Sequence, residues 1–297
     1  MYVWFGERRG RTTSRVTTDL LDRAAPRNRS LLLDDVDDVQ EAAAVLAAGG
    51  AVGQAFGNFY VLTTRPDAAT VRRINLLKGR PPDQVGSVVT TPLRIPLLFD
   101  WSALPDGLTP RVVRSVVDAL FELGPFGFRG PAAAHVPDHL AQVDGGIRTT
   151  QVIAPGYACP SNRFLSRALD LIGDDLLYVT SANRSRHLTG APDEPAHWRA
   201  DGLRAEFGAD PGFVVLTHPD DVAARRRYPL HAPMSTTIVA FHKVARSGRD
   251  VRLVVERHGS LPVEDLGAVI GRLGFGLEIA PSAARRLELG EYEGVSA

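Results

Sequence analysis

The sequence has almost no cysteine and no long apolar run. Cys159 is the single cysteine in 297 residues, so an internal disulfide is impossible and a zinc site built on cysteines is nearly excluded. No stretch approaches the roughly 20 apolar residues that a membrane-spanning helix needs. No apolar segment follows the arginine-rich N-terminus, which argues against a secretory signal. These absences predict a cytoplasmic protein without a membrane partner.

Net charge is missing as well. The 34 basic residues balance 34 acidic ones, so the overall charge indicates neither a nucleic acid nor an anionic membrane as the partner, although local basic patches stay open. The hydrophobic content of 44% and the charged content of 23% are typical of a globular protein. A chain of this length can bury a substantial core as one large domain or two smaller ones.

The order of the patterns predicts one α/β domain with an extension at each end. Residues 1–33 carry several arginines and little periodicity, and we expect them to form an N-terminal extension. From residue 34 to residue 260, helical and strand-like patterns alternate, which predicts an open or three-layer α/β sheet. The C-terminal tail, residues 261–297, begins with a helical pattern.

Two helices near the start of the domain are predicted together with their ends. Aspartates at residues 34–38 favour the N-terminus of a helix that alanines continue and that Gly49-Gly50 end. Asp67 is expected to cap a second helix, which carries one apolar face. This face is formed by Val71, Ile74 and Leu77, whereas Arg72, Arg73 and Asn75 are expected to point outward.

Short apolar runs between glycines and prolines are predicted to be strands. These runs lie at residues 51–56, 58–62, 85–90, 126–131, 176–180, 213–216, 236–241 and 251–257. Two further helices are expected at residues 110–123 and 163–171.

Lys78 and Arg80 are the first candidates for ligand binding. They flank Gly79 at the end of the second predicted helix, and Pro81-Pro82 prevents that helix from continuing. Two cations held at a fixed angle, on a backbone that a ligand can approach closely, suit a phosphate group. Read alone, the tripeptide is more simply a pair of charges that complements the helix dipole.

Polar residues at strand ends are the second group of candidates. Thr180 ends a predicted buried strand, and Ser181 and Asn183 follow it, at the place where open α/β sheets bind ligands. Their short hydroxyl and amide groups can hold a phosphate or a ribose, although a Ser- and Asn-rich turn is the simpler reading of this segment alone. Arg129 closes another predicted strand and Arg257 ends the last one, and each offers a rigid bidentate fork.

Taken in order, these segments resemble the YrdC family, the threonylcarbamoyl-adenylate synthases. The resemblance covers roughly residues 34–260, and its most specific part is the Lys-x-Arg segment followed about 100 residues later by Ser-x-Asn. The matching residues are Gly49-Gly50, Tyr60, Leu62, Lys78-Gly79-Arg80-Pro81, Arg129, Thr180-Ser181-Ala182-Asn183 with Ser185, Thr236-Thr237-Ile238-Val239 and Arg257-His258-Gly259. With only about 38 residues after Gly259, the chain resembles the short members that lack a second domain.

The resemblance implies a fold, a reaction and a set of site residues. The fold is a twisted mixed α/β sheet with helices around a concave, positively charged cavity. In the reaction, ATP, bicarbonate and an amino acid give a carbamoyl-adenylate and pyrophosphate, with Mg²⁺ as a cofactor. No metal site formed by protein residues is expected. The resemblance makes Lys78, Arg80, Ser181 and Asn183 catalytic, and it adds Arg129, Thr180, Thr236 and Arg257 to these four as the residues that bind the ATP phosphates.

One segment departs from the family pattern. The Pro-Thr-Asp/Glu-Thr segment, which surrounds the amino-acid substrate in the family, is replaced here by residues 55–58. Phe56 offers no hydrogen bond, and Gly57 has no carboxylate to meet an ammonium group. We therefore expect an amine pocket that includes Phe56, Gly57, Asn58 and Tyr60 and takes a larger or more apolar substrate than threonine. Arg186 also replaces the glycine that the family has after Asn-x-Ser.

Three functions are open on these grounds. The first is synthesis of a carbamoyl-adenylate of an amino acid or other amine, for use by a carbamoyl-acceptor enzyme. The second is the housekeeping synthesis of threonylcarbamoyl-adenylate, together with the proteins that modify tRNA at position 37. The third is a non-catalytic module that binds a nucleotide or RNA, with the N-terminal arginines and Arg225-Arg226-Arg227 adding basic charge.

Overall fold

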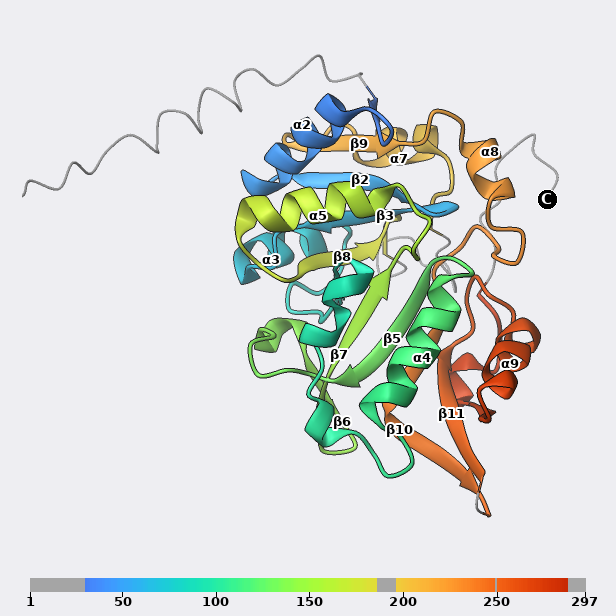
Figure 1. The fold of residues 1–297 in the computed structure, drawn as a ribbon. Coiled ribbons are helices and arrows are strands. Elements are labelled where there is room, and N and C mark those ends of the chain that lie inside the picture. The colour runs from blue at the N-terminus through green and yellow to red at the C-terminus, as the bar shows by residue number, and fades with distance from the viewer. Residues whose placement is uncertain (1–29, 186–195, 249, 288–297) are drawn as a thin grey trace, which may run out of the picture.

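A computed structural model describes residues 30–185, 196–248 and 250–287 of the chain (Figure 1). Most of the predicted N-terminal extension, the end of the predicted tail and Arg186 lie outside the described residues. Within the described part, no helix is long and apolar enough to cross a membrane.

One twisted mixed sheet of 12 strands organises the described chain, as the resemblance predicted. The strands follow the order β1-β9-β2-β3-β8-β4-β7-β5-β10-β11-β12, and β6 pairs with β7 off this path. Their bounds are β1 Leu31–Leu32, β2 Ala51–Phe56, β3 Phe59–Thr64, β4 Ser87–Val89, β5 Phe126–Pro131, β6 Gln142–Asp144, β7 Ile147–Ala154, β8 Leu177–Ser181, β9 Phe213–Thr217, β10 Ile238–Ser247, β11 Asp250–Arg257 and β12 Gly276–Ile279.

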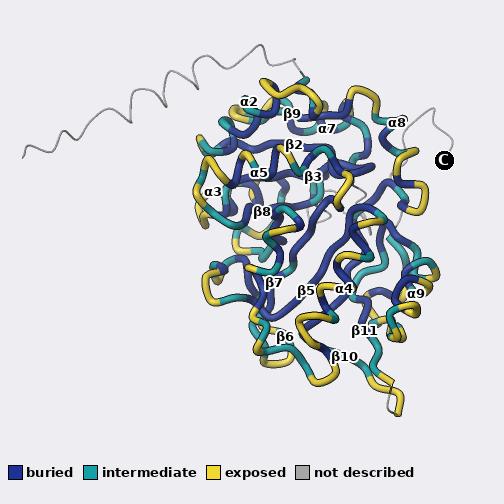
Figure 2. The backbone as a smooth tube through the Cα atoms, viewed as in Figure 1, coloured by how far each residue is buried: buried dark blue, intermediate teal, exposed yellow. Residues whose placement is uncertain are grey.

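Helices cover the sheet where their apolar faces match it. Their bounds are α2 Val36–Ala47, α3 Ala68–Leu77, α4 Pro110–Phe121, α5 Ser161–Ile172, α7 Ala200–Phe207, α8 Asp221–Arg226 and α9 Val263–Arg272. Helices α2 and α5 pack against each other and contact β9 and β2, while α4 and α9 contact each other near β10 and β11 (Figure 1). Figure 2 shows that the central strands are almost wholly buried, which places the apolar core on both faces of the sheet.

The predicted helix ends are confirmed by their caps. The side chain of Asp35 accepts hydrogen bonds from the backbone of Asp37 and Asp38 at the start of α2, and Asp67 accepts from the backbone N–H of Thr70 at the start of α3. Helix α4 begins at Pro110, where a missing N–H costs nothing. Each of these helices was expected from the sequence within a few residues of its observed bounds.

The expected outward placement of Asn75 on α3 is wrong. Its side chain is fully buried, whereas Arg72 on the same helix is exposed. The Asn75 amide donates to the backbone carbonyls of Gln84 at 2.9 Å and Pro82 at 3.3 Å, and its oxygen accepts from the Tyr178 hydroxyl at 3.0 Å. Asn75 therefore fixes the loop that follows the helix instead of facing solvent.

The packing continues past both expected domain boundaries. Strand β1, which lies before residue 34, pairs with β9. Beyond residue 260, α9 buries Leu266 and Ile270 in the core and β12 pairs with β11. The sheet thus includes part of each segment that we expected to be an extension or a tail.

The hairpin of β6 and β7 is an addition that we did not predict. It pairs Gln142 with Thr149 and Asp144 with Ile147 across Gly145-Gly146, which have φ values of +58° and +81°. Strand β7 then runs between β4 and β5 in the middle of the sheet. Its position makes it one wall of the cavity described next.

Candidate functional site

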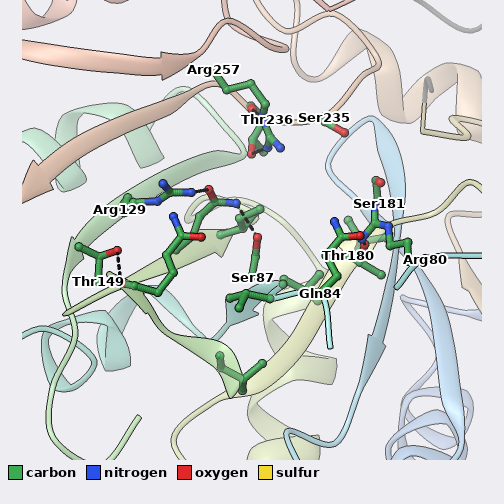
Figure 3. Close-up of a pocket in the computed structure, with 18 of the residues that line it drawn as sticks. Arg80, Gln84, Ser87, Arg129, Thr149, Thr180, Ser181, Ser235, Thr236 and Arg257 are labelled. Atoms are coloured by element: carbon green, nitrogen blue, oxygen red, sulfur yellow. Dashed lines mark hydrogen bonds between the residues drawn. The ribbon is translucent and has the colours of Figure 1, made fainter. Parts of the chain in front are cut away.

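A cavity of about 190 Å³ opens over the middle of the sheet (Figure 3). Strands β3, β4, β5, β7, β8 and β11 and the loop after α3 all contribute side chains to its wall. The polar and charged lining residues are Arg80, Gln84, Ser87, Arg129, Gln142, Thr149, Gln151, Thr180, Ser181, Ser235, Thr236 and Arg257. Three of them are arginines, and none of the described lining residues is an aspartate or a glutamate.

The end of α3 aims Arg80 at this cavity. Lys78 is the C-cap of the helix, and Gly79 takes the left-handed conformation with φ +71°, which glycine adopts at little cost. The backbone N–H groups of Gly79 and Arg80 then donate to the carbonyls of Leu76 and Asn75 at 2.9 and 2.8 Å. This helix-ending turn reverses the chain and leaves the Arg80 side chain half-buried on the cavity wall.

Both halves of the predicted motif meet at the end of β8. Arg80 donates from Nη1 to the Thr180 hydroxyl at 2.6 Å, and Lys78 donates from Nζ to the backbone carbonyl of Ser181. The two cations do not share a position, because Arg80 lines the cavity whereas Lys78 is fully buried behind it. Lys78 thus supports the strand end on which Thr180 and Ser181 lie.

Arg129 forms the opposite wall together with a chain of neutral polar groups. Its Nη2 donates to the Gln151 amide oxygen at 3.0 Å, and the Gln151 amide nitrogen donates to the Ser87 hydroxyl at 2.5 Å (Figure 3). These contacts cross β5, β7 and β4, which are neighbours in the sheet. The neutral Gln151 amide therefore orients the guanidinium without pairing with its charge, and the one carboxylate near it among the described residues, Glu256, lies 3.3 Å from Nη1 and does not line the cavity.

Arg257 closes the third side of the cavity. Its Nε and Nη2 donate to the backbone carbonyl and the hydroxyl of Thr236 at 2.7 and 3.0 Å. Burial, helped by the nearby guanidinium groups of Arg129 and Arg80, lowers the pKa of Arg257 to about 10. Three guanidinium groups that repel one another around one cavity form a site whose charge an anion would balance.

The structure brings six of the eight predicted phosphate-binding residues to one cavity. These are Arg80, Arg129, Thr180, Ser181, Thr236 and Arg257. The other two, Lys78 and Asn183, are buried and do not line it, and the Asn183 amide donates to the carbonyl of Arg184 at 2.8 Å. The predicted catalytic set thus divides into cavity residues and residues that pack behind them.

None of the residues predicted for the amine pocket lines this cavity. Gly57 and Asn58 form the two-residue turn between β2 and β3, where Gly57 has φ +72°. The Asn58 amide donates to the carbonyl of His231 at 2.6 Å, and the Tyr60 hydroxyl donates to Asp221 at 2.7 Å. Phe56 has no exposed surface and packs edge-on against Phe59. The tight hairpin thus keeps these four residues away from this cavity, and the Asn58 side-chain oxygen is buried without a hydrogen-bond partner among the described residues.

Several cavity residues carried no signal that we recognised in the sequence. Gln84, Ser87, Gln142, Thr149, Gln151 and Ser235 all line the wall. The carbonyl oxygen of the Gln84 side chain is buried there without a hydrogen-bond partner among the described residues. A usable signal existed in residues 147–154, which are rich in β-branched side chains and follow Gly145-Gly146, a pair that is typical of a hairpin turn.

Comparison with solved structures shows which fold this is. The structure matches Sua5 of P. abyssi, solved in complex with L-threonine, with a TM-score of 0.55 and 18% identity over 86% of this chain and 65% of that one. It matches a doubly substituted form of P. abyssi Sua5 with a TM-score of 0.55 and 18% identity over 85% of this chain and 66% of that one. It matches a hypothetical protein from Streptococcus mutans with a TM-score of 0.57 and 17% identity over 85% of this chain and 95% of that one.

These matches confirm the YrdC-like fold that the sequence motifs predicted. The chain spans about two thirds of the length of the Sua5 protein and nearly the full length of the Streptococcus mutans protein. No protein-family model and no curated protein sequence matches the chain. The shared property is therefore the fold, and the chemistry of the site is argued from its own residues.

Proposed function

We propose that the cavity binds the phosphates of ATP and that the protein makes a carbamoyl-adenylate of an amino acid or other amine. The observation that carries this proposal is the convergence of Arg80, Arg129 and Arg257 on a cavity whose described lining has no carboxylate. Like charges held close together cost free energy, and an anion with several negative oxygens offsets that cost. Arginine forks also match phosphate oxygens in bidentate geometry.

The proposed reaction joins three substrates. The amine nitrogen bonds to the carbon of bicarbonate with loss of water, and an oxygen of the resulting carbamate displaces pyrophosphate from the α-phosphorus of ATP. Negative charge grows on the phosphate oxygens during the displacement, and fixed guanidinium groups stabilise that charge without reorganising. Short hydroxyl donors at Thr180, Ser181 and Thr236 add hydrogen bonds around the same cavity.

Mg²⁺ would enter this site mainly on the nucleotide. The described lining offers hydroxyl and amide oxygens but no aspartate or glutamate, so the protein supplies weak ligands for a hard cation. The triphosphate itself supplies strong oxygen ligands. The arginines and Mg²⁺ would then neutralise different oxygens of the same phosphate chain.

Threonine is the first amine to test, because the matching P. abyssi Sua5 was solved with L-threonine. Formation of threonylcarbamoyl-adenylate for tRNA modification is accordingly the second candidate function. The hairpin turn at residues 57–58 is a reason to test a wider panel of amines. It offers neither a hydroxyl nor a carboxylate at the position where the family pattern has threonine and acidic side chains. The panel should therefore contain small, aromatic and anionic amines besides threonine.

Release of pyrophosphate tests the proposal directly. Purified protein is incubated with ATP, Mg²⁺, bicarbonate and each amine in turn, and release is expected with at least one amine and only when bicarbonate is present. The Arg80→Ala variant is the matched control, because it removes one cavity cation from a half-buried position. Absence of release with every amine, together with RNA binding that weakens steeply with salt, would instead favour the non-catalytic module.

A further inference from the structure

A cluster of charged side chains lies directly behind the cavity wall at Arg129. Glu256 lies 3.3 Å from Arg129 Nη1 through its Oε2 and 2.6 Å from Lys243 Nζ through its Oε1. Lys243 Nζ also donates to Asp144 at 2.7 Å, and His242 Nε2 lies 2.7 Å from the same carboxylate oxygen. Four strands contribute to the cluster, namely β5, β6, β10 and β11.

Two irregularities in the pairing of β10 with β11 build this cluster. The register moves from Ile238–Arg257 to Val239–Val255, so Glu256 is an extra residue on β11. It then moves from Ala240–Val254 to Val244–Leu253, which leaves residues 241–243 of β10 without partners on β11. Bulges break the alternation of side chains and re-aim them. Here they allow Glu256 to face Arg129 although the adjacent Arg257 also lines the cavity.

Glu256 is shared unequally between its two cationic neighbours. Its contact with Lys243 is short, whereas the contact with Arg129 lacks hydrogen-bond geometry. Glu256 Oε2 and Arg129 Nε are both buried without a hydrogen-bond partner among the described residues. The Glu256 side chain is only 10% exposed, so its charge is little screened by water. The position of this carboxylate therefore determines how strongly positive the electrostatic potential from Arg129 is in the cavity.

The cluster does not need a metal ion to balance it. Ligand atoms of Asp144, His242 and Glu256 lie within 4.8 Å of one another, which is a geometry that could hold a cation. The Lys243 ammonium already lies between the two carboxylates. Hydrogen bonds from Lys243 and then from His242 lower the pKa of Asp144 to about 2, so this group is a carboxylate that pairs with the ammonium at neutral pH.

We propose that Lys243 is a positioning residue that draws Glu256 away from Arg129 and so keeps the Arg129 guanidinium available to an anion in the cavity. The inference rests on the proposed function, because it assumes that the cavity binds phosphate oxygens. Without Lys243, the Glu256 carboxylate has Arg129 as its main cationic neighbour, and it competes with the ligand for the Arg129 guanidinium. With Lys243 present, Arg129 keeps Gln151 as its hydrogen-bonded partner and retains its positive charge.

Pyrophosphate binding measured by calorimetry tests this role without any turnover. Lys243→Met should bind pyrophosphate about tenfold more weakly than the wild type, whereas Lys243→Arg should bind it as the wild type does. Glu256→Gln should bind at least as tightly as the wild type. In the Lys243→Met/Glu256→Gln double variant the loss should vanish, because no carboxylate is left to compete for Arg129.

The outcomes separate this inference from the proposed function. If the wild type does not bind pyrophosphate, both fail. If the wild type binds it and Lys243→Met binds equally well, only the role of Lys243 fails. If the loss in Lys243→Met persists in the double variant, Lys243 acts through the fold and not through Glu256. Thermal unfolding of each variant shows whether it is folded at the temperature of the titration, so that a lower affinity is not caused by unfolded protein.

Discussion

The Arg80 guanidinium donates to the Thr180 hydroxyl at 2.6 Å, although 100 residues separate the two in the sequence. Arg80 follows the turn that ends α3, and Thr180 lies on β8 next to β3 in the middle of the sheet. One hydrogen bond therefore joins the two halves of the Lys-x-Arg and Ser-x-Asn pattern. It also fixes a cation at the edge of the cavity that Arg129 and Arg257 line from other sides (Figure 3).

Replacing Arg257 by lysine should weaken ATP binding about tenfold while the charge is kept. The guanidinium holds both the carbonyl and the hydroxyl of Thr236, and a lysine ammonium cannot reproduce this planar fork. The loss corresponds to about 1.4 kcal/mol, which is the scale of one hydrogen bond to a charged group. Calorimetric titration with ATP measures it, and equal affinities of the two proteins would show that the fork has no part in binding.

Replacing Lys78 by alanine should destabilise the fold as well as disturb the site. Lys78 is fully buried and donates to the Ser181 carbonyl, so the change removes that donor and leaves space around the lost stem. We expect the free energy of unfolding to fall by about 2–4 kcal/mol. Urea denaturation measures this, and Lys78→Met, which keeps the stem, should lose less. A wild-type unfolding free energy in Lys78→Ala would contradict the buried position.

Asn75→Ala should loosen the loop that carries Arg80 and Gln84. The change removes an amide that holds the carbonyls of Gln84 and Pro82 and accepts from Tyr178. Buried groups left without partners cost about 1–3 kcal/mol, so stability should fall by at least this amount and pyrophosphate affinity severalfold. Arg72→Ala on the exposed side of the same helix is the control and should change neither quantity. Retained affinity in Asn75→Ala would show that the loop keeps its shape without this residue.

Stability should fall as the pH drops from 6.5 to 4, and His231 should account for part of the fall. Burial lowers the pKa of His231 from its ordinary value of 6.5 to about 4. In this window the unfolded chain binds a proton that the folded chain excludes, so acid favours unfolding by about 3 kcal/mol at pH 4 relative to pH 7. Urea denaturation at several pH values should show a shallower decline for His231→Gln. Parallel declines would rule out a neutral buried His231.

Local patterns predicted the parts of the fold that depend on neighbouring residues. The Asp67 cap, the alanine-rich α2 and the glycine turn at Gly79 each follow from sequence, since caps and left-handed turns need particular residue types. The arginines of the cavity were identified because they stand at strand and helix ends in the family order. The mixed sheet followed from the same order, and the solved structures confirm it.

Other features depend on contacts between distant residues, and the sequence does not display them. Asn75 is a polar residue of the kind usually found on the surface, yet Tyr178 and the loop at Gln84 enclose its side chain. Glu256 reaches Arg129 only because the pairing of β10 with β11 is irregular. Phe56 was expected at a substrate pocket, and it lies fully buried at the end of β2, a strand that neighbouring parts of the fold cover along its whole length.

Titration of the wild type with ATP tests the central claim most directly, with Arg80→Ala and Arg72→Ala measured beside it. If the cavity binds the nucleotide phosphates, the wild type and Arg72→Ala should bind ATP with the same affinity. Arg80→Ala should then bind about tenfold or more weakly, because it loses a charged hydrogen-bond donor of the cavity wall. Absence of ATP binding by the wild type, or equal binding by Arg80→Ala, would contradict the account.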